Sequence, residues 1–118
     1  MSALENFRLA MSAPSGPRDP HDIGVLLGAC VRRLCAEKGL ASAEIWEGGP
    51  LVTMFFTPNH PWEAVVVGPD AYQLYPGFVN GDDVSWPNIW VADNYSLDKL
   101  IRELGEAIET AAAEEAKV

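Results

Sequence analysis

Positive charge is missing from the middle of this sequence. No Lys or Arg lies between Lys38 and Lys99, and the 118-residue chain has a formal net charge of −9 at pH 7. The acidic residues of that stretch are Glu44, Glu47, Glu63, Asp70, Asp82, Asp83, Asp93 and Asp98. Such a field repels nucleic acid and anionic membranes, so we expect neither as a direct partner. It favours a basic protein surface as the partner, although acidity also simply keeps small proteins soluble.

Cysteine is scarce, and long apolar runs are absent. Cys30 and Cys35 lie five residues apart in one expected helix and point about 140° away from each other, so we expect no disulfide between them. The N-terminus lacks the basic and then apolar pattern of a signal peptide, and no run approaches the roughly 20 residues of a spanning helix. Free thiols fit a reducing compartment. We therefore expect a cytoplasmic protein.

Recognisable catalytic motifs are also missing. The chain has no Gly-rich phosphate loop, no nucleophile elbow, no Cys-x-x-Cys and no His-Glu-x-x-His. Oxygen ligands for a hard cation are available at Asn80, Asp82, Asp83 and Asp93, but their spacing lacks the order of the calcium-binding loop. We therefore predict no enzyme activity, no cofactor and no metal site.

Helical periodicity marks both ends of the chain. Asp19 and Pro20 are a typical helix start, the apolar stripe runs from Ile23 to Leu34, and Gly39 is a typical helix end. Ser96 or Asn94 caps a closing helix, which presents an apolar stripe from Leu97 to Ile108. A short opening helix follows a capping box and leads into a Pro-rich linker. We expect an N-terminal arm over 1–19 and a single domain over 20–118.

Between the helices, short apolar runs alternate with turn signals. Segments 43–47, 51–57, 62–67 and 71–75 read as four strands of an antiparallel meander, and segment 88–92 reads as a fifth. The predicted fold class is therefore α+β: an antiparallel meander of four to five strands, with an N-terminal and a C-terminal amphipathic helix packed on one face.

Residues 76–87 read as a long loop, of the length at which functional loops concentrate. The loop combines aromatic residues with carboxylates, and Asn80-Gly81 favours a tight turn there. Trp86 either anchors a partner or folds back to plug the end of the sheet. The partner-binding residues that we predict are Tyr75, Phe78, Asp82, Asp83, Trp86 and Trp90.

These features favour a non-catalytic, acidic protein-binding module that masks a basic surface of a partner. By analogy of size and charge, toxin-neutralising immunity proteins and phage-encoded inhibitors of nucleic-acid enzymes act in this way. One alternative is a ligand-binding or enzymatic domain with a pocket under the loop 76–87; its candidate polar groups are Thr53, Tyr72, Gln73 and His60. A second alternative is a secretion-type chaperone or adaptor, and self-association as a homodimer stays open.

Overall fold

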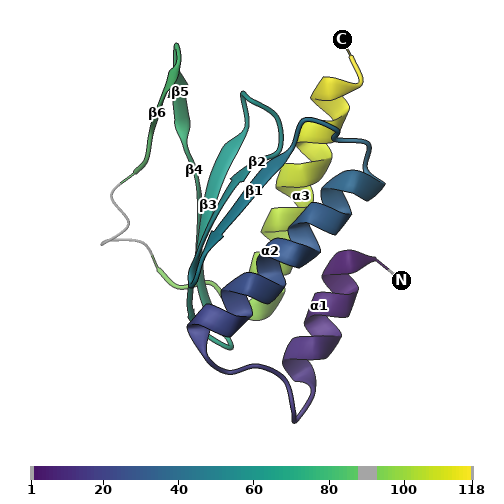
Figure 1. Ribbon diagram of the computed structural model, residues 1–118, viewed down its shortest axis with the longest axis vertical. Coiled ribbons are helices and arrows are strands. Elements are labelled where there is room, and N and C mark those ends of the chain that lie inside the picture. The colour runs from purple at the N-terminus through teal and green to yellow at the C-terminus, as the bar shows by residue number, and fades with distance from the viewer. Residues whose placement is uncertain (1, 88–92, 118) are drawn as a thin grey trace.

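The chain folds into a four-stranded sheet that carries helices on one side and a small hairpin on the other (Figure 1). The computed structural model describes residues 2–87 and 93–117. Strands β1 to β4 pair in chain order and antiparallel, and β5 pairs with β6 in a separate two-stranded sheet. The elements are α1 (Ala3–Ser12), α2 (Pro20–Glu37), β1 (Glu44–Gly48), β2 (Leu51–Phe55), β3 (Pro61–Gly68), β4 (Ala71–Pro76), β5 (Phe78–Asn80), β6 (Asp83–Ser85) and α3 (Leu97–Glu115). The predicted α+β class is confirmed.

The helix boundaries follow from the predicted capping residues. The Asp19 carboxylate accepts a hydrogen bond from the His21 amide at 2.8 Å and so opens α2. Ser96 accepts from the Lys99 amide at 3.2 Å and opens α3. Gly39 stands just beyond α2 with φ of 77°, a left-handed conformation that glycine adopts without strain. Within the described ranges, no helix combines the length and apolarity needed to cross a membrane.

Helices α2 and α3 bury their apolar stripes against one face of the sheet, as predicted. From the sheet, Val52, Met54 and Ala64 meet them and are fully buried. The six helix residues expected in the core are all at most 9% exposed: Leu27, Val31, Leu34, Leu100, Ile101 and Leu104. Burial of this apolar area supplies most of the free energy that holds the helices to the sheet.

The opening helix α1 packs on the outer side of α2 and α3, away from the sheet (Figure 1). A helix of ten residues is marginal in isolation, so it depends on this docking. Ala3, Leu4 and Phe7 are buried and belong to the same core cluster as the other two helices. The helix of the N-terminal arm therefore contributes directly to the core.

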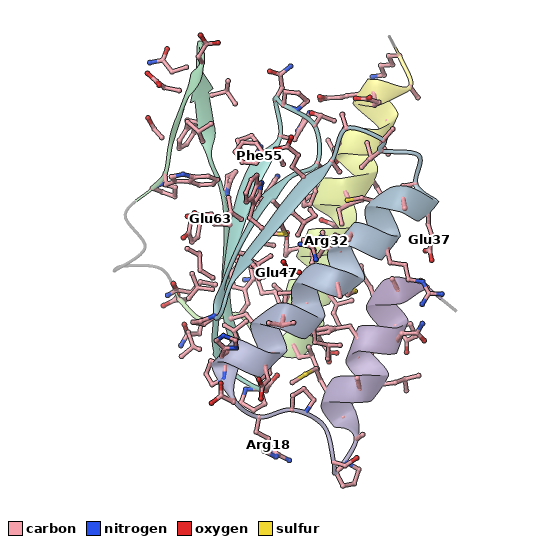
Figure 2. The ribbon with its side chains drawn as sticks, in the orientation of Figure 1. Arg18, Arg32, Glu37, Glu47, Phe55 and Glu63 are labelled. Carbon is pink, nitrogen blue, oxygen red and sulfur yellow. The ribbon has the colours of Figure 1, made fainter. Side chains whose placement is uncertain are left out.

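Two glycines allow α2 to approach the β1–β2 hairpin closely. A Cβ atom at Gly24 would lie 1.9 Å from the carbonyl oxygen of Gly49, and one at Gly28 would lie 2.2 Å from Cγ of Glu47. One turn further along, Arg32 donates to the Ile45 carbonyl at 2.9 Å and pairs with the Glu47 carboxylate, as Figure 2 shows. These contacts fix the edge strand β1 against the helix.

The two cysteines are unlinked, as predicted. Burial raises the pKa of the Cys35 thiol to about 11. The pKa of Cys30 rises to about 12, chiefly through burial and also through the nearby Glu37 carboxylate. Both groups are therefore protonated thiols at neutral pH, and a protonated thiol is a poor nucleophile.

The prediction that residues 76–87 form a loop without regular structure was wrong, because most of this segment is the hairpin β5–β6. Its strands have only three residues each, too few for alternation to mark them in the sequence. Gly81, with φ of 66°, occupies the first of the two turn positions and so permits a two-residue hairpin turn. The fifth strand predicted over 88–92 lies outside the described residues.

The Arg32–Glu47 pair generates a pH-dependent prediction. The hydrogen bond and charge of Arg32 lower the pKa of the Glu47 carboxyl in the folded state. A carboxyl whose folded pKa is below its unfolded value of about 4.3 adds stability above that value and loses it as pH falls through the folded pKa. Glu47→Gln should therefore lower the free energy of unfolding at pH 7, and the difference should shrink below about pH 4.

Urea denaturation of both chains between pH 3 and 7 measures this effect. Glu37→Gln is the matched control, because Glu37 forms an exposed i,i+4 pair with Arg33 of the same helix. Such pairs contribute about 0.2–0.5 kcal/mol. A stability difference for Glu47→Gln that stays constant over the whole range would contradict the assignment.

Candidate functional site

The helices leave the opposite face of the meander uncovered, and we call this surface the open face. Its side chains alternate along each strand with the buried ones. Figure 2 shows two of them, Phe55 and Glu63, on the hairpin side of the sheet. The strand register gives its members as three cross-strand rows: Glu44, Phe55 and Pro61; Trp46, Thr53, Glu63 and Tyr75; and Leu51, Val65 and Gln73.

Large apolar side chains of the open face and of the hairpin stand in solvent. On the sheet, Trp46 is 62% exposed and Leu51 is 37% exposed. On the hairpin, Phe78 is 63% exposed and Val79 is 40% exposed. Single exposed apolar residues are normal on protein surfaces, whereas several large exposed side chains on neighbouring elements are typical of an interaction surface.

A hydrogen-bonded group forms the floor of the open face. The Tyr75 hydroxyl donates to one oxygen of Glu63 at 2.8 Å, and the Thr53 hydroxyl donates to the other at 3.3 Å. Burial and the hydrogen bond to Glu63 raise the pKa of Tyr75 above its usual value. The phenol therefore stays protonated at neutral pH and donates a hydrogen bond, and both oxygens of the Glu63 carboxylate accept hydrogen bonds within the chain.

The hairpin is held to the open face at its base. The Gly77 amide donates to the Pro61 carbonyl at 2.8 Å. The Trp86 ring meets Tyr75 edge to face, with ring centres 6.2 Å apart and an angle of 78° between the planes. The Trp86 ring also covers Gly77, where a Cβ atom would lie 2.8 Å from it. Of its two expected placements, Trp86 therefore adopts the one that folds back onto the sheet.

The hairpin and the sheet enclose an open cleft of about 370 Å³. Val79 and Val84 face each other across the hairpin and line the cleft. Asp82 at the hairpin turn also lines it, whereas Asp83 and Phe78 do not. The complete lining is Ser42, Glu44, Phe55, Pro58, Asn59, Val79, Gly81, Asp82 and Val84.

In the part of the chain that the structure describes, the carboxylates on this side of the molecule form no ion pair with a Lys or Arg side chain. Strands β1 to β6 contain no Lys or Arg. Among residues 2–87 and 93–117, the side-chain carboxylates of Glu44 and Asp82 take part in no hydrogen bond and no ion pair. The side chains of Arg8, Arg32, Arg33 and Lys38 pair with carboxylates on the helix side instead.

The structure brings some of the predicted partner-binding residues together. Tyr75 and Trp86 are in contact, and Phe78, Asp82 and Asp83 share the hairpin. Trp90 lies outside the described residues. Sequence reasoning missed Trp46 as a surface residue, although the signal was present, because Trp46 alternates with the buried Ile45 in β1.

The polar groups predicted for a pocket do not converge, which corrects that expectation. Tyr72 is fully buried on the helix side, where its hydroxyl donates to the Pro69 carbonyl at 2.8 Å. His60 pairs with Glu114 of α3. Only Thr53 and Gln73 lie on the open face. In the described part of the chain, no group of three or more His, Cys, Asp or Glu side chains is arranged to hold a metal ion.

The placement of Trp86 predicts a modest role in stability. Removal of its ring in Trp86→Ala uncovers Tyr75 and loses an aromatic pair, which contributes about 0.5–1.5 kcal/mol beyond area burial. We expect a decrease in the free energy of unfolding of at least that size, measured by urea denaturation. Phe78→Ala is the matched control from the same hairpin and should change it by less than about 0.5 kcal/mol. Equal effects of the two variants would contradict the packing described for Trp86.

The chain has no match among protein-family models, and no significant match among curated proteins or solved structures. Fold alone does not give function, since one architecture serves many activities. The chemistry of the open face therefore follows from its own side chains.

Proposed function

We propose that the chain is a non-catalytic, cytoplasmic protein-binding module whose open face and hairpin mask a basic surface of a partner protein. Immunity proteins that neutralise toxins and phage-encoded inhibitors act in this way. The observation that carries the proposal is the combination of exposed aromatic rings with unpaired carboxylates on the side of the sheet that the helices leave uncovered.

The exposed rings supply the affinity. Trp46 and Phe78 are more than 60% exposed, Trp46 in strand β1 of the sheet and Phe78 in strand β5 of the hairpin. Interface hot spots are enriched in large aromatic side chains because their burial removes a large apolar area from water. The edge-to-face contact of Tyr75 with Trp86 holds the base of the hairpin that carries Phe78.

The carboxylates increase the association rate and make binding specific for a basic partner. Charges at the rim of an interface raise the association rate with a partner of opposite charge and contribute little net affinity. They also disfavour a second copy of this chain, because two surfaces of the same sign repel each other. A basic partner is therefore a better occupant of the open face than a homodimer.

The alternative of a small-ligand domain has one supporting observation, the cleft under the hairpin. Its volume of about 370 Å³ falls near the lower end of the range of ligand pockets, about 300–1,000 Å³. However, the predicted polar groups Tyr72 and His60 do not line it. The cleft is better explained as part of the same protein-binding surface.

Variants of the two rings test the proposal. The immobilised chain is used to capture binding proteins from an extract of its source cells. Each captured protein is then purified, and its binding to the chain is measured by surface plasmon resonance. We expect a basic protein whose dissociation constant rises about 30-fold or more in Trp46→Ala and Phe78→Ala, as for hot spots. Leu9→Ala, on α1, is the matched control because Leu9 is 50% exposed on the helix side. The proposal fails if no captured protein depends on the two rings, or if Leu9→Ala has the same effect.

The variant Asp83→Asn tests the proposed electrostatic role of the carboxylates separately from the role of the rings. Asp83 lies in β6 and does not line the cleft, so Asp83→Asn removes one charge without removing a cleft contact. We expect slower association and a weaker dependence of its rate on salt, with the dissociation rate nearly unchanged. Faster dissociation with unchanged association would instead assign Asp83 a direct contact.

A further inference from the structure

We propose that the cleft between the hairpin and strands β1–β2 receives the guanidinium group of an arginine side chain of the basic partner. The inference deepens the proposed function and rests on it. It names the chemical group that the partner must present at one defined place on the open face.

The charge of the cleft selects a cation. Glu44 lies on the sheet wall and Asp82 on the hairpin wall, and both carboxylates line the cleft without a partner in the described part of the chain. No Lys, Arg or His belongs to the lining. An anion would be repelled from both walls, and a neutral group would leave both carboxylates partly desolvated without compensation.

The apolar part of the cleft selects arginine among cations. Phe55 and the two valines Val79 and Val84 line the same space. A guanidinium is planar, stacks on an aromatic face and is more weakly hydrated than an ammonium group, so it loses less on entering such a site. Its donors are spread around a rigid plane and can bind carboxylates on two walls at once, whereas the ammonium of lysine is a compact point charge.

Glu63 is a further carboxylate on this side of the molecule, but it differs from Glu44 and Asp82 because it already has hydrogen-bond partners within the chain. Both of its oxygens already accept hydrogen bonds from Tyr75 and Thr53. Glu63 therefore completes the floor of the open face, and the two carboxylates of the cleft are left to bind an external donor. The division follows from position, because Glu44 and Phe55 pair at the end of the sheet that the hairpin turn covers.

Small probes test the cleft without knowledge of the partner. The full chain, labelled on its backbone amides and valine methyl groups, is titrated in NMR with N-acetyl-arginine methylamide. The neutral isostere, N-acetyl-citrulline methylamide, and the lysine analogue are titrated in parallel. We expect saturable shifts centred on Val79, Val84 and Gly81 with the arginine probe. Affinity should be about tenfold or more lower for the citrulline probe, since it loses charge-assisted hydrogen bonds, and also lower for the lysine probe.

Conservative variants locate the charges. Glu44→Gln and Asp82→Asn should each weaken binding of the arginine probe severalfold, while Asp83→Asn, next to the cleft but not lining it, should weaken it less than either, since its charge acts only from a distance. Unchanged shifts elsewhere in the amide spectrum establish that each variant is folded. Citrulline binding of equal strength, tighter binding of lysine, equal effects of all three variants, or no saturable shift would each overturn the assignment.

The two proposals fail in different ways. If the partner depends on Trp46 and Phe78 but binds Glu44→Gln and Asp82→Asn with unchanged affinity, the arginine site is wrong and the protein-binding function stands. If the arginine probe binds in the cleft but no protein depends on the two rings, the proposed function is wrong and the cleft is a site for a free cationic ligand.

Discussion

The close approach of α2 to the β1–β2 hairpin determines which face of the sheet is covered. At Gly24 and Gly28 the helix comes so near to the strands that no side chain fits between them. Arg32 then holds the edge strand through the Ile45 carbonyl and the Glu47 carboxylate. With α2 fixed on this face, α3 packs beside it and α1 packs over both. Among residues 2–87 and 93–117, no helix lies on the other face of the sheet, which is the open face.

The uneven distribution of charge between the two sides of the molecule follows from the same arrangement. The helices carry most of the cations, and several pair with carboxylates across elements: Lys38 of the α2 end with Glu109 at 2.7 Å, and Arg8 of α1 with Asp98 of α3. Exposed pairs of this kind add little stability. Their larger effect is that the helix side is nearly neutralised locally, while the sheet and hairpin contain no cation. One side of the molecule is therefore uniformly acidic.

The sequence predicted most of the fold, because caps and periodic apolar positions are local signals. Asp19, Ser96 and the stripe through Leu27 and Leu104 were placed correctly. The candidate site was predicted only in part. The three-residue strands of the hairpin are too short for a period to emerge, and the contact of Trp86 with Tyr75 depends on a chain reversal that no local pattern encodes. Trp46, in contrast, was missed although its alternation with the buried Ile45 in β1 was a local signal.

The Trp86 ring connects the hairpin to the open face of the sheet. It rests on Tyr75, whose hydroxyl is held by Glu63, so the base of the hairpin stands on a floor fixed by packing and hydrogen bonds. The cleft exists only while the hairpin keeps this position, since one of its walls is β5–β6. Pre-organisation of this kind lowers the ordering cost of binding. Trp86 does not line the cleft, and it acts on the cleft at a distance by fixing the position of the hairpin wall.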